Sequence, residues 1–574
     1  MPMNTGQESR SYARGSRDAP LLDSTIGAVL ERTATLYPDR EALVVVPEGV
    51  RLRWREFLEE VDRVARGMAA MGVGKGHRVA IWATNRSQWV LTQFATARIG
   101  AVMVNINPGY GSRELHYALE QSETQTLVAI SGFRSANYLQ MIAEICPEAV
   151  GAKPNDWRSE SLPHLRNLVL AGEGQPLAGM GRWDEMVTAG DAVDTEGVEG
   201  ETGTSLSPHD PINIQYTSGT TGYPKGAVLT HHNIVNNAWL VGQRMELTCR
   251  DSVCIPVPFY HCFGMVLGNM ACAVQGATMV IPAEAFDPWT TLKAIEKERC
   301  TAVYGVPTMF IRELEHPEFS QVDLGSLRTG IMAGSPCPIE VMKQVVDKMH
   351  CREMTIAYGL TESSPVITQT GVSDPLRTRV TTVGRPLPHT EVKIVDPGSG
   401  EVAPRGTPGE LCTRGYLVMS GYYRNPRATR EAIDSEGWLH TGDLATLDEE
   451  GYCRITGRVK DMIIRGGENV YPREIEEFLY THPAVSDVQV VGVPDARMGE
   501  EVLAWIQLKE PGMATDRDIK DFCRGKIAKF KIPRYIKFVD SYPMTVTGKI
   551  QKYRIREIAI RELGLEDISN TPTA

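Results

Sequence analysis

The stretch YTSGTTGYPKG, residues 216–226, follows the sequence INIQ, which is typical of the end of a strand. Glycines, hydroxyls and one lysine after a strand predict a loop that holds phosphate, because glycine lets the backbone approach an anion and lysine adds positive charge. A P-loop carries Ser or Thr directly after its lysine, where the hydroxyl reaches Mg²⁺. In this chain Gly226 follows Lys225, and Pro224 precedes it. The sequence therefore favours a phosphate loop of another kind, with a flexible surface loop as the plainer alternative.

Short apolar runs separated by helix-sized spacers extend from this loop in both directions. One spacer, residues 57–73, places Leu58, Val61, Ala65 and Met68 on one face of a predicted helix. Predicted strands are RVAIWA, AVMVNIN, TLVAIS and NLVLAG upstream, and VCIPVPF, TMVIP, AVYGVP and IMAGS downstream. This alternation predicts an α/β fold whose mostly parallel sheets are flanked by helices.

The chain has 574 residues, more than one hydrophobic core usually supports, so several domains are expected. From about Glu391, short strands joined by Gly- and Asp-containing turns predict a small, more antiparallel β-rich subdomain. After the sequence GRVKD a compact α+β pattern follows, in which residues 518–530 are expected to form a helix. We predict a large N-terminal domain over residues 1–459 and a small, mobile C-terminal domain over residues 460–574.

Composition narrows the classes of protein. The formal net charge of −11 argues against a nucleic-acid binder, which would present a basic face. Eleven scattered cysteines without any CxxC pair give no support to closely spaced metal or redox sites and indicate a reducing compartment. The N-terminal residues lack the apolar core of a secretory signal. We predict a cytoplasmic protein that is a monomer or a homodimer.

Residues 252–283 contain no Asp, Glu, Lys or Arg, which first suggests a transmembrane helix. Pro256, Pro258, Asn269 and Gln275 interrupt the segment, however. A strand, a buried helix and a second strand fit this pattern better. We therefore predict a dry interior wall and no transmembrane segment.

Further motifs follow the loop in a recognisable order. They are FYHCFG (259–264), YGLTES (358–363), WLHTGD (438–443), GRVKDMIIRGGENVYPREIE (457–476) and PMTVTGKIQK (543–552). Together with the loop they resemble the signature set of the adenylate-forming superfamily, which includes acyl-CoA synthetases, luciferases and peptide-synthetase adenylation domains. The likeness extends over nearly the whole chain, from about Ser24 to about Leu563. Each motif alone has low specificity, but six motifs in this order make the resemblance highly specific.

The resemblance implies a binding site for ATP. It places the opening loop over the β- and γ-phosphates, Thr361 at the α-phosphate, and Glu362 on Mg²⁺, which prefers hard carboxylate oxygens. Asp443 would accept hydrogen bonds from the ribose hydroxyls, assisted by Arg458. Gly334, Ser335, Pro336 and Tyr358 would flank adenine, with Tyr358 stacked on the base. The ATP-contacting residues implied in this way are Thr217, Ser218, Gly219, Thr220, Thr221, Gly222, Lys225, Gly334, Ser335, Pro336, Tyr358, Gly359, Asp443 and Arg458. The plainer alternatives are a solvated charge for Glu362 and a core aromatic for Tyr358.

The resemblance also assigns the reacting groups. Lys549 would contact both the attacking carboxylate and the α-phosphate, because joining two anions needs charge neutralisation and alignment. His261 would gate the acyl site, the alternative being a satisfied core histidine. Lys460 would be the pivot of the mobile domain, and Gly467 would line the pantetheine path of coenzyme A.

Three other residues are assigned no catalytic role. Cys262 is expected to be a packing residue. His231 and His232 are expected to start a helix without a metal.

The predicted enzyme is an AMP-forming acyl-CoA synthetase, an acid–thiol ligase. The resemblance implies that the uncharged segment walls the acyl pocket, where Met265, Val266, Leu267 and Met270 supply an apolar lining. The stretches FYHCFGMVLGN and GGENVYPREIEE most resemble medium-chain fatty acyl-CoA synthetases. ATP, a fatty acid and coenzyme A would be its substrates, with Mg²⁺ as cofactor. The alternatives are an aryl-CoA ligase and a fatty acyl-AMP ligase that loads a carrier protein.

Two rivals lie outside this reaction. A P-loop ATPase or GTPase is disfavoured by Gly226 after the lysine. A catalytically dead binding protein would be expected to have lost Glu362, Asp443 or Lys549, and all three are present.

Overall fold

The computed structural model describes residues 10–154, 156–192, 206–217, 224–335, 337–466, 468–544 and 550–566. By its internal contacts the chain divides into two compact units. The larger unit consists of Ala13–Val392 and Thr413–Leu439. The smaller unit contains Lys393–Cys412, the chain from His440 onward and the segment before Ala13. The predicted domain boundary between Val459 and Lys460 is not one of these division points. That residues 460–574 move as a separate domain stays a prediction.

One sheet of the larger unit carries the opening loop. Its strands run in the order β10-β9-β6-β4-β5-β11-β12-β22. The strands from β10 to β11 are parallel, whereas β12 and β22 are antiparallel to their neighbours. Their bounds are β4 (Arg78–Trp82), β5 (Val102–Asn105), β6 (Thr126–Ala129), β9 (Asn167–Leu170), β10 (Gly181–Arg182), β11 (Pro211–Thr217), β12 (Lys225–Thr230) and β22 (Gly421–Tyr422).

The other large sheet of this unit runs β19-β18-β17-β16-β15-β13-β14-β2-β3. The strands from β17 to β2 are parallel, and β18, β19 and β3 add antiparallel edges. Their bounds are β2 (Glu41–Val45), β3 (Val50–Arg53), β13 (Ser252–Cys254), β14 (Thr278–Ile281), β15 (Ala302–Gly305), β16 (Thr329–Ala333), β17 (Glu353–Gly359), β18 (Val366–Gln369) and β19 (Arg385–Pro386). All eight apolar runs that the sequence indicated as strands lie in these two sheets.

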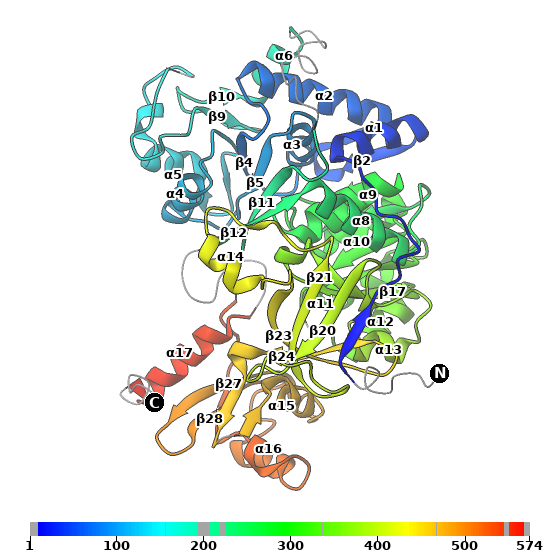
Figure 1. The fold of residues 1–574 in the computed structure, drawn as a ribbon, viewed down its shortest axis with the longest axis vertical. Coiled ribbons are helices and arrows are strands. Elements are labelled where there is room, and N and C mark those ends of the chain that lie inside the picture. Colours follow the sequence, from blue (N-terminus) through cyan, green and yellow to red (C-terminus); the bar gives the residue numbers. More distant parts are fainter. Residues whose placement is uncertain are drawn as a thin grey trace. The chain divides into compact units, whose positions relative to one another are not determined.

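Helices pack against both sheets (Figure 1). They are α1 (Ile26–Leu36), α2 (Trp54–Ala70), α3 (Ser87–Arg98), α4 (Ser112–Gln121), α5 (Tyr138–Ile145), α6 (Trp183–Gly190), α8 (His231–Arg244), α9 (Ala271–Gln275), α10 (Pro288–Glu298), α11 (Pro307–Leu314), α12 (Ile339–Lys348), α13 (Leu376–Thr381) and α14 (Pro426–Ala432). Short 3₁₀ turns are η1 (Val46–Glu48), η2 (Pro147–Ala149), η4 (Phe319–Gln321) and η5 (Thr361–Ser363), and a small hairpin joins β7 (Gly132–Phe133) to β8 (Ala136–Asn137).

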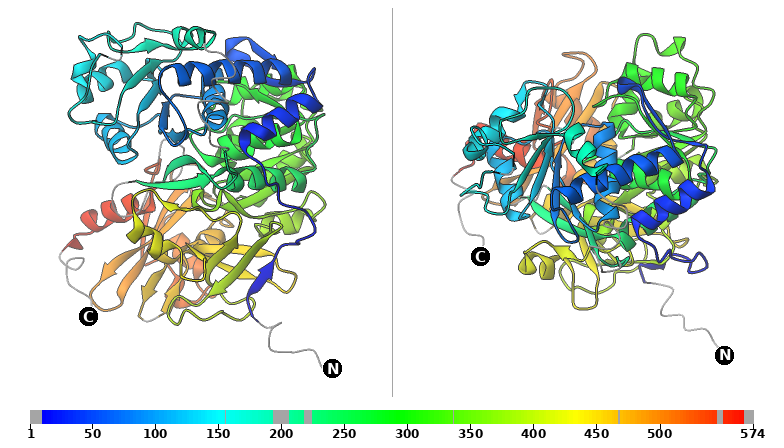
Figure 2. Two further views of the ribbon diagram at one scale, coloured as in Figure 1. Left: turned by 45° about the horizontal axis from the view of Figure 1, so that its top comes forward. Right: turned by 90° about the horizontal axis from the view of Figure 1, so that it is seen from above.

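Helix α2 illustrates how the sequence pattern becomes packing. Val61, Ala65 and Met68 are buried as the periodicity predicted, whereas Leu58 is only partly buried. The side chain of Glu56 accepts a hydrogen bond from the backbone N–H of Arg53 at 2.8 Å, which satisfies an otherwise unpaired donor at the helix start. The views in Figure 2 show α2 beside α1 at the dark-blue end of the chain, where the two helices are in contact.

The uncharged segment of residues 252–283 folds as predicted into a strand, a buried helix and a second strand. Strand β13 leads to the π-helix η3 (Phe263–Met270), which continues as α9 and then β14. Almost the whole π-helix is buried. Among the helices of the described residues, none is both long enough and apolar enough to cross a membrane.

The smaller unit confirms the α+β pattern. It contains β25 (Ile463–Arg465), β26 (Glu468–Val470), α15 (Pro472–Leu479), β27 (Val485–Asp495), β28 (Gly499–Leu508), α16 (Asp516–Cys523), η7 (Lys529–Lys531), β29 (Tyr535–Phe538) and α17 (Lys552–Glu562). The helix predicted over residues 518–530 was wrong at its C-terminal end. It ends at Cys523 because Arg524 is extended and Gly525 adopts a φ of +72°.

The β-rich subdomain forms the sheet β1-β20-β21-β23-β24. The points at which the chain changes from one unit to the other lie within strands of this sheet. Its strands are β1 (Tyr12–Arg14), β20 (Thr390–Val395), β21 (Gly409–Gly415), β23 (Leu439–Leu447) and β24 (Cys453–Arg458), followed by the turn η6 (Val459–Asp461). Strands β23 and β24 are antiparallel, as the turn-rich sequence predicted.

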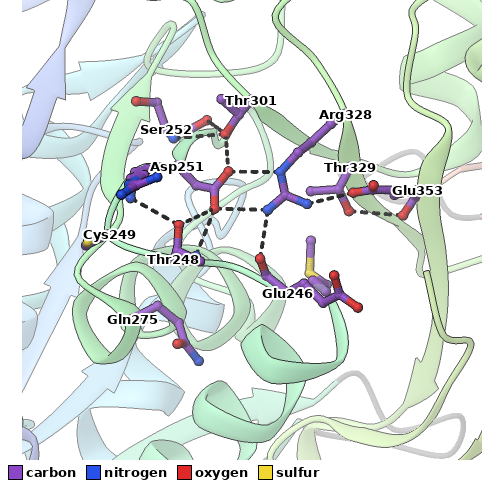
Figure 3. Close-up of polar contacts among 12 residues, drawn as sticks. Glu246, Thr248, Cys249, Asp251, Ser252, Gln275, Thr301, Arg328, Thr329 and Glu353 are labelled. Atoms are coloured by element: carbon purple, nitrogen blue, oxygen red, sulfur yellow. Dashed lines mark hydrogen bonds and ion pairs between the residues drawn. The ribbon is translucent and has the colours of Figure 1, made fainter. Parts of the chain in front are cut away.

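An ion cluster ties together the starts of neighbouring parallel strands in the larger unit (Figure 3). Asp251 precedes β13 and accepts hydrogen bonds from Arg328, which precedes β16, at 3.1 Å on one oxygen and 2.9 Å on the other. Thr301, just before β15, donates to the same carboxylate at 2.7 Å, and Arg328 also reaches Glu353 at the start of β17 at 2.7 Å. The cluster therefore fixes the register of β13, β15, β16 and β17.

Replacing Asp251 with Ala should lower the free energy of unfolding by about 3 kcal/mol, because Arg328 loses its bidentate partner. We place the effect at the low end for a broken buried pair, since the Arg328 side chain is 32% exposed. Urea unfolding of the purified proteins measures it. The control is Asp39→Ala, which removes a surface pair with Arg55 and should cost less than about 1 kcal/mol. Equal effects of the two changes would contradict the structural role of the cluster.

The same variant has a predictable pH dependence. Burial disfavours the Asp251 carboxylate, but hydrogen bonds from Arg328, Thr301 and Thr248 outweigh burial, so the pKa of Asp251 is lowered. A lowered folded-state pKa contributes stability above the unfolded pKa of about 3.9, and this contribution is lost as the pH falls through the folded-state value. The difference in free energy of unfolding between the wild type and Asp251→Ala should therefore become smaller as the pH is lowered through the folded-state pKa of Asp251.

Candidate active site

The opening loop joins two antiparallel strands. Strand β11 ends at Thr217, whose register partner is Lys225, the first residue of β12. A P-loop instead connects a strand to a helix, so the strand–loop–strand geometry agrees with the prediction of a different phosphate loop. Of the loop residues implied to contact ATP, Ser218, Gly219, Thr220, Thr221 and Gly222 lie outside the described residues.

Tyr422 links two of the predicted ATP residues. It lies on β22, which pairs with β12, and its ring centroid is 5.1 Å from Nζ of Lys225. Its hydroxyl donates a hydrogen bond to Oε1 of Glu362 at 2.7 Å. Burial, together with the adjacent Glu362 carboxylate, raises the pKa of Tyr422, so the phenol stays protonated and remains a donor. The structure thus brings the loop lysine to the ring, and the predicted Mg²⁺ ligand to the hydroxyl, of one tyrosine.

Glu362 sits on a rigid turn. Gly359 ends β17, and a Cβ at this position would lie 1.8 Å from the carbonyl oxygen of Pro365, so only glycine fits. The backbone N–H of Leu360 donates to the same carbonyl at 2.9 Å. These contacts hold the 3₁₀ turn η5, in which Thr361 and Glu362 are both partly exposed. Both predicted residues are therefore fixed in position and open to a ligand.

The residues predicted to flank adenine follow two paired strands. Ala333 on β16 and Ala357 on β17 are register partners in a parallel pair. Gly334 and Ser335 come directly after the first strand, while Tyr358 and Gly359 end the second. Because parallel strands bring their carboxyl ends to one edge, these residues meet there. Gly334 and Ser335 are exposed and Tyr358 is partly buried; Pro336 lies outside the described residues.

His261 lies on a tight turn before the π-helix. Its ring centroid is 4.3 Å from that of Tyr260, and it is partly exposed. A Cβ at Gly264 would lie 2.4 Å from the carbonyl oxygen of Pro258, so this turn needs glycine. The partial exposure favours a residue at the edge of a site over a core histidine.

Cys262 is a packing residue, as the sequence indicated. It is buried, its thiol donates to Oε1 of Gln215 at 3.1 Å, and burial raises its pKa. A protonated, buried thiol is a poor nucleophile. Gln215 lies on β11, so this contact joins the FYHCFG turn to the strand that leads into the phosphate loop.

The predicted acyl wall is buried and apolar along the π-helix. Met265, Val266, Leu267 and Met270 are all nearly inaccessible to solvent. Met265 also receives contacts from two buried amides, since its sulfur lies 3.5 Å from Nδ2 of Asn105 and 3.6 Å from Nε2 of Gln215. π-Helical turns frequently occur at functional sites.

The predicted ribose residues pair within the smaller unit. Asp443 on β23 and Arg458 on β24 are register partners, and Nε of Arg458 donates to Oδ1 of Asp443 at 2.9 Å. Glu410 on β21 supports the preceding turn, accepting from the N–H of Gly442 at 3.0 Å and contacting Nδ1 of His440 at 2.9 Å. Arg458 and Glu410 thus hold the Asp443 carboxylate and its backbone in place.

Two protein-family models match this chain. The model of the AMP-binding enzyme family matches residues 30–423. The chain belongs to this family. A second model, the AMP-binding enzyme C-terminal domain, matches residues 474–549. The resemblance to the adenylate-forming superfamily is therefore confirmed.

Individual AMP-binding enzymes are similar over nearly the whole chain. YngI of Bacillus subtilis (strain 168) is 55% identical over 547 residues, 95% of this chain and 99% of YngI. The mitochondrial medium-chain acyl-CoA ligase ACSF2 of Danio rerio is 47% identical over 557 residues, 97% of this chain and 91% of that protein. The crystal structure of the anthranilate CoA ligase AuaEII in complex with anthranoyl-AMP is 27% identical with a TM-score of 0.82, covering 95% of this chain and 99% of that one. These relatives confirm the predicted α/β fold.

The remaining predicted residues of this AMP-binding enzyme are only partly placed. Lys460 is exposed in the turn η6, directly after the strand that carries Arg458. Lys549 and Gly467 lie outside the described residues. Tyr422 and Glu410 were not predicted from the sequence, because their contacts arise from strand pairing rather than from any motif.

Proposed function

We propose that this chain is an ATP-dependent, AMP-forming acyl-CoA synthetase that activates medium-chain fatty acids. The observation that carries the proposal is the Lys225–Tyr422–Glu362 arrangement. The ring of Tyr422 faces the loop lysine, and its hydroxyl donates to the carboxylate that we propose as the Mg²⁺ ligand. The 47% identity to an enzyme named medium-chain acyl-CoA ligase supports the substrate class.

In the first half-reaction, a carboxylate oxygen of the fatty acid attacks the α-phosphorus of ATP and pyrophosphate leaves, forming an acyl-adenylate. Glu362 fits the role of Mg²⁺ ligand, because Tyr422 orients its carboxylate through one oxygen and the other oxygen can take the ion. When bound, Mg²⁺ neutralises charge on the phosphate oxygens. Lys225 steadies the leaving pyrophosphate, and Lys549 neutralises the repulsion between the two reacting anions.

In the second half-reaction, the thiol of coenzyme A attacks the acyl carbonyl and AMP leaves, with the thiol proton released. The two half-reactions need different groups over the same carbonyl. We propose that the C-terminal domain of residues 460–574 reorients about Lys460 between them, withdrawing Lys549 and presenting Gly467 to the pantetheine chain.

The acyl site is proposed to lie along the π-helix. His261 gates the carboxylate, and the flexible side chains of Met265 and Met270 accommodate an alkyl chain. The segment from β13 to β14 carries no charge that could pair with the ammonium of an amino acid. This favours aliphatic acids, with aryl acids as the second candidate.

We further propose a cytoplasmic location and a monomer or homodimer. All eleven cysteines lie in the described part of the chain and are free thiols, which suits a reducing compartment.

Pyrophosphate release across C2 to C18 and aryl acids, with and without coenzyme A, tests the function. We expect the largest kcat/KM with medium-chain aliphatic acids and an acyl-CoA product that requires coenzyme A. Release with none of the acids would refute the synthetase activity. Acyl-AMP that accumulates and is unaffected by coenzyme A would favour the carrier-protein alternative, and preference for aryl acids would favour an aryl-CoA ligase.

A further inference from the structure

Metal-ligating side chains from distant segments meet in the larger unit. Asp23 precedes α1, His209 precedes β11, and His232 lies in the first turn of α8. One ligand atom from each lies within 4.8 Å of the other two. The ring centroids of the two histidines are 4.8 Å apart. One carboxylate and two imidazoles are thus gathered at a single point.

Hydrogen bonds fix the backbone that carries each of these side chains. The buried amide of Asn236 on α8 accepts from the N–H of Leu22 at 2.7 Å and donates to its carbonyl at 3.0 Å, which anchors the residue before Asp23. The N–H of His232 donates to the carbonyl of Pro208 at 2.7 Å, which anchors the residue before His209. Helices α1 and α8 are themselves in contact (Figure 1). Such support from neighbouring groups is what holds a binding site in its geometry.

The imidazole of His232 is suited to coordination. Nδ2 of Asn236 lies 2.9 Å from the His232 carbonyl and 3.0 Å from the Leu22 carbonyl, so two carbonyls can take both of its hydrogens. Nδ1 of His232 lies 3.2 Å from Nδ2 of Asn236 but is not required to accept a hydrogen bond from it. The tautomer of the His232 ring can therefore respond to a ligand.

We propose that Asp23, His209 and His232 form a binding site for a divalent transition ion, with Zn²⁺ as the best fit. Imidazole nitrogens select Zn²⁺, Co²⁺, Ni²⁺ and Cu²⁺ over Mg²⁺, so this site differs in kind from the one at Glu362. Bonds of about 2.0–2.1 Å to a tetrahedral ion place ligand atoms roughly 3.3 Å apart. The exposed side chains of Asp23 and His209 can close the remaining distance by changing rotamer.

The bound ion would act as a staple between the segment before α1, the approach to β11 and the start of α8. It would stabilise the folded chain by mass action, because the unfolded chain does not hold these ligands together. The helix start at His231 was predicted correctly from the sequence. The proposed metal role of His232 revises the expectation that the His231–His232 pair needs no metal. This role requires Asp23 and His209, which no local sequence motif connects to His232.

Metal binding tests the proposal without ATP, fatty acid or coenzyme A, so its outcome is independent of the proposed enzyme activity. Untagged, chelator-treated full-length protein is dialysed against Co²⁺ in excess Mg²⁺, and bound cobalt is measured by visible absorption and elemental analysis. We expect a bound Co²⁺ whose affinity falls at least about tenfold in Asp23→Ala and in His209→Ala. Both changes are at exposed positions and should preserve the fold. Zn²⁺ should raise the Tm of the wild type and not that of His209→Ala.

Two control variants make the result specific. His164→Ala removes an exposed histidine that pairs with Glu123 at 3.4 Å, and it should leave Co²⁺ affinity unchanged. Cys412→Ser alters the other described group of potential ligands, Glu410, Cys412 and His440. A thiolate-to-cobalt band in the near ultraviolet that is lost in Cys412→Ser would move the metal to that group and overturn the proposal. Absence of bound Co²⁺, or affinity that is unchanged in Asp23→Ala and His209→Ala, would overturn it equally.

Discussion

Lys549→Ala should lose acyl-adenylate formation by on the order of 10²- to 10³-fold in kcat, the usual effect of removing a group that stabilises charge in the transition state. It should still convert supplied acyl-AMP and coenzyme A to acyl-CoA at close to the wild-type rate. The reason is that only the first half-reaction joins two anions, whereas the thiol attacks a neutral carbonyl. Pyrophosphate release and thioester formation, assayed separately, measure the two effects.

The control for this variant is Lys509→Ala, which removes an exposed lysine directly after β28 and should change neither assay. If Lys549→Ala lost both half-reactions equally, the proposed reorientation about Lys460 would be contradicted. Lys549 would then act in both half-reactions from one domain arrangement. The thermal stability of both variants should match the wild type, which separates a catalytic effect from unfolding.

Much of the fold could be predicted because its signals are local. The 3.6-residue period around Val61, the apolar runs of the parallel strands and the proline-interrupted segment of residues 252–283 each determine an element with little help from distant residues. The helix ending at Cys523 shows the limit of such reasoning. Its apolar pattern continues toward Phe530, but the positive φ at Gly525 ends the helix, and a glycine near a helix end is only a weak signal in the sequence.

The site could be predicted only as far as its motifs extend. Glu362 and Asp443 lie within short motifs whose chemistry is readable from residue type. Tyr422 and Glu410 act through strand pairing: β22 beside β12 brings Tyr422 over Lys225, and Glu410 reaches Gly442 from β21. Such contacts depend on register between segments that are distant in sequence, and single-sequence patterns do not contain register. The same reason hides the cluster of Asp23, His209 and His232.

Glu362→Gln should lower kcat/KM for adenylation by about 10²-fold, because a neutral amide binds Mg²⁺ weakly and the charge on the phosphates is left uncompensated. The loss should appear as a demand for higher Mg²⁺ in the pyrophosphate assay. Conversion of supplied acyl-AMP to acyl-CoA should be largely retained, since pyrophosphate and its metal have left by then. A variant that loses both half-reactions equally would refute the metal role of Glu362.

Tyr422→Phe separates orientation of the carboxylate from the carboxylate itself. It removes the hydroxyl that donates to Glu362 at 2.7 Å but keeps the ring that faces Lys225 at 5.1 Å. We expect a loss of about tenfold in Mg²⁺ affinity, the lower range for removing a group that orients a metal ligand. The effects of Tyr422→Phe and Glu362→Gln on Mg²⁺ affinity should be non-additive in the double variant, because without the Glu362 carboxylate the tyrosine has nothing to orient. Full additivity in the double variant would show that Tyr422 acts independently of Glu362, through Lys225 and the phosphates.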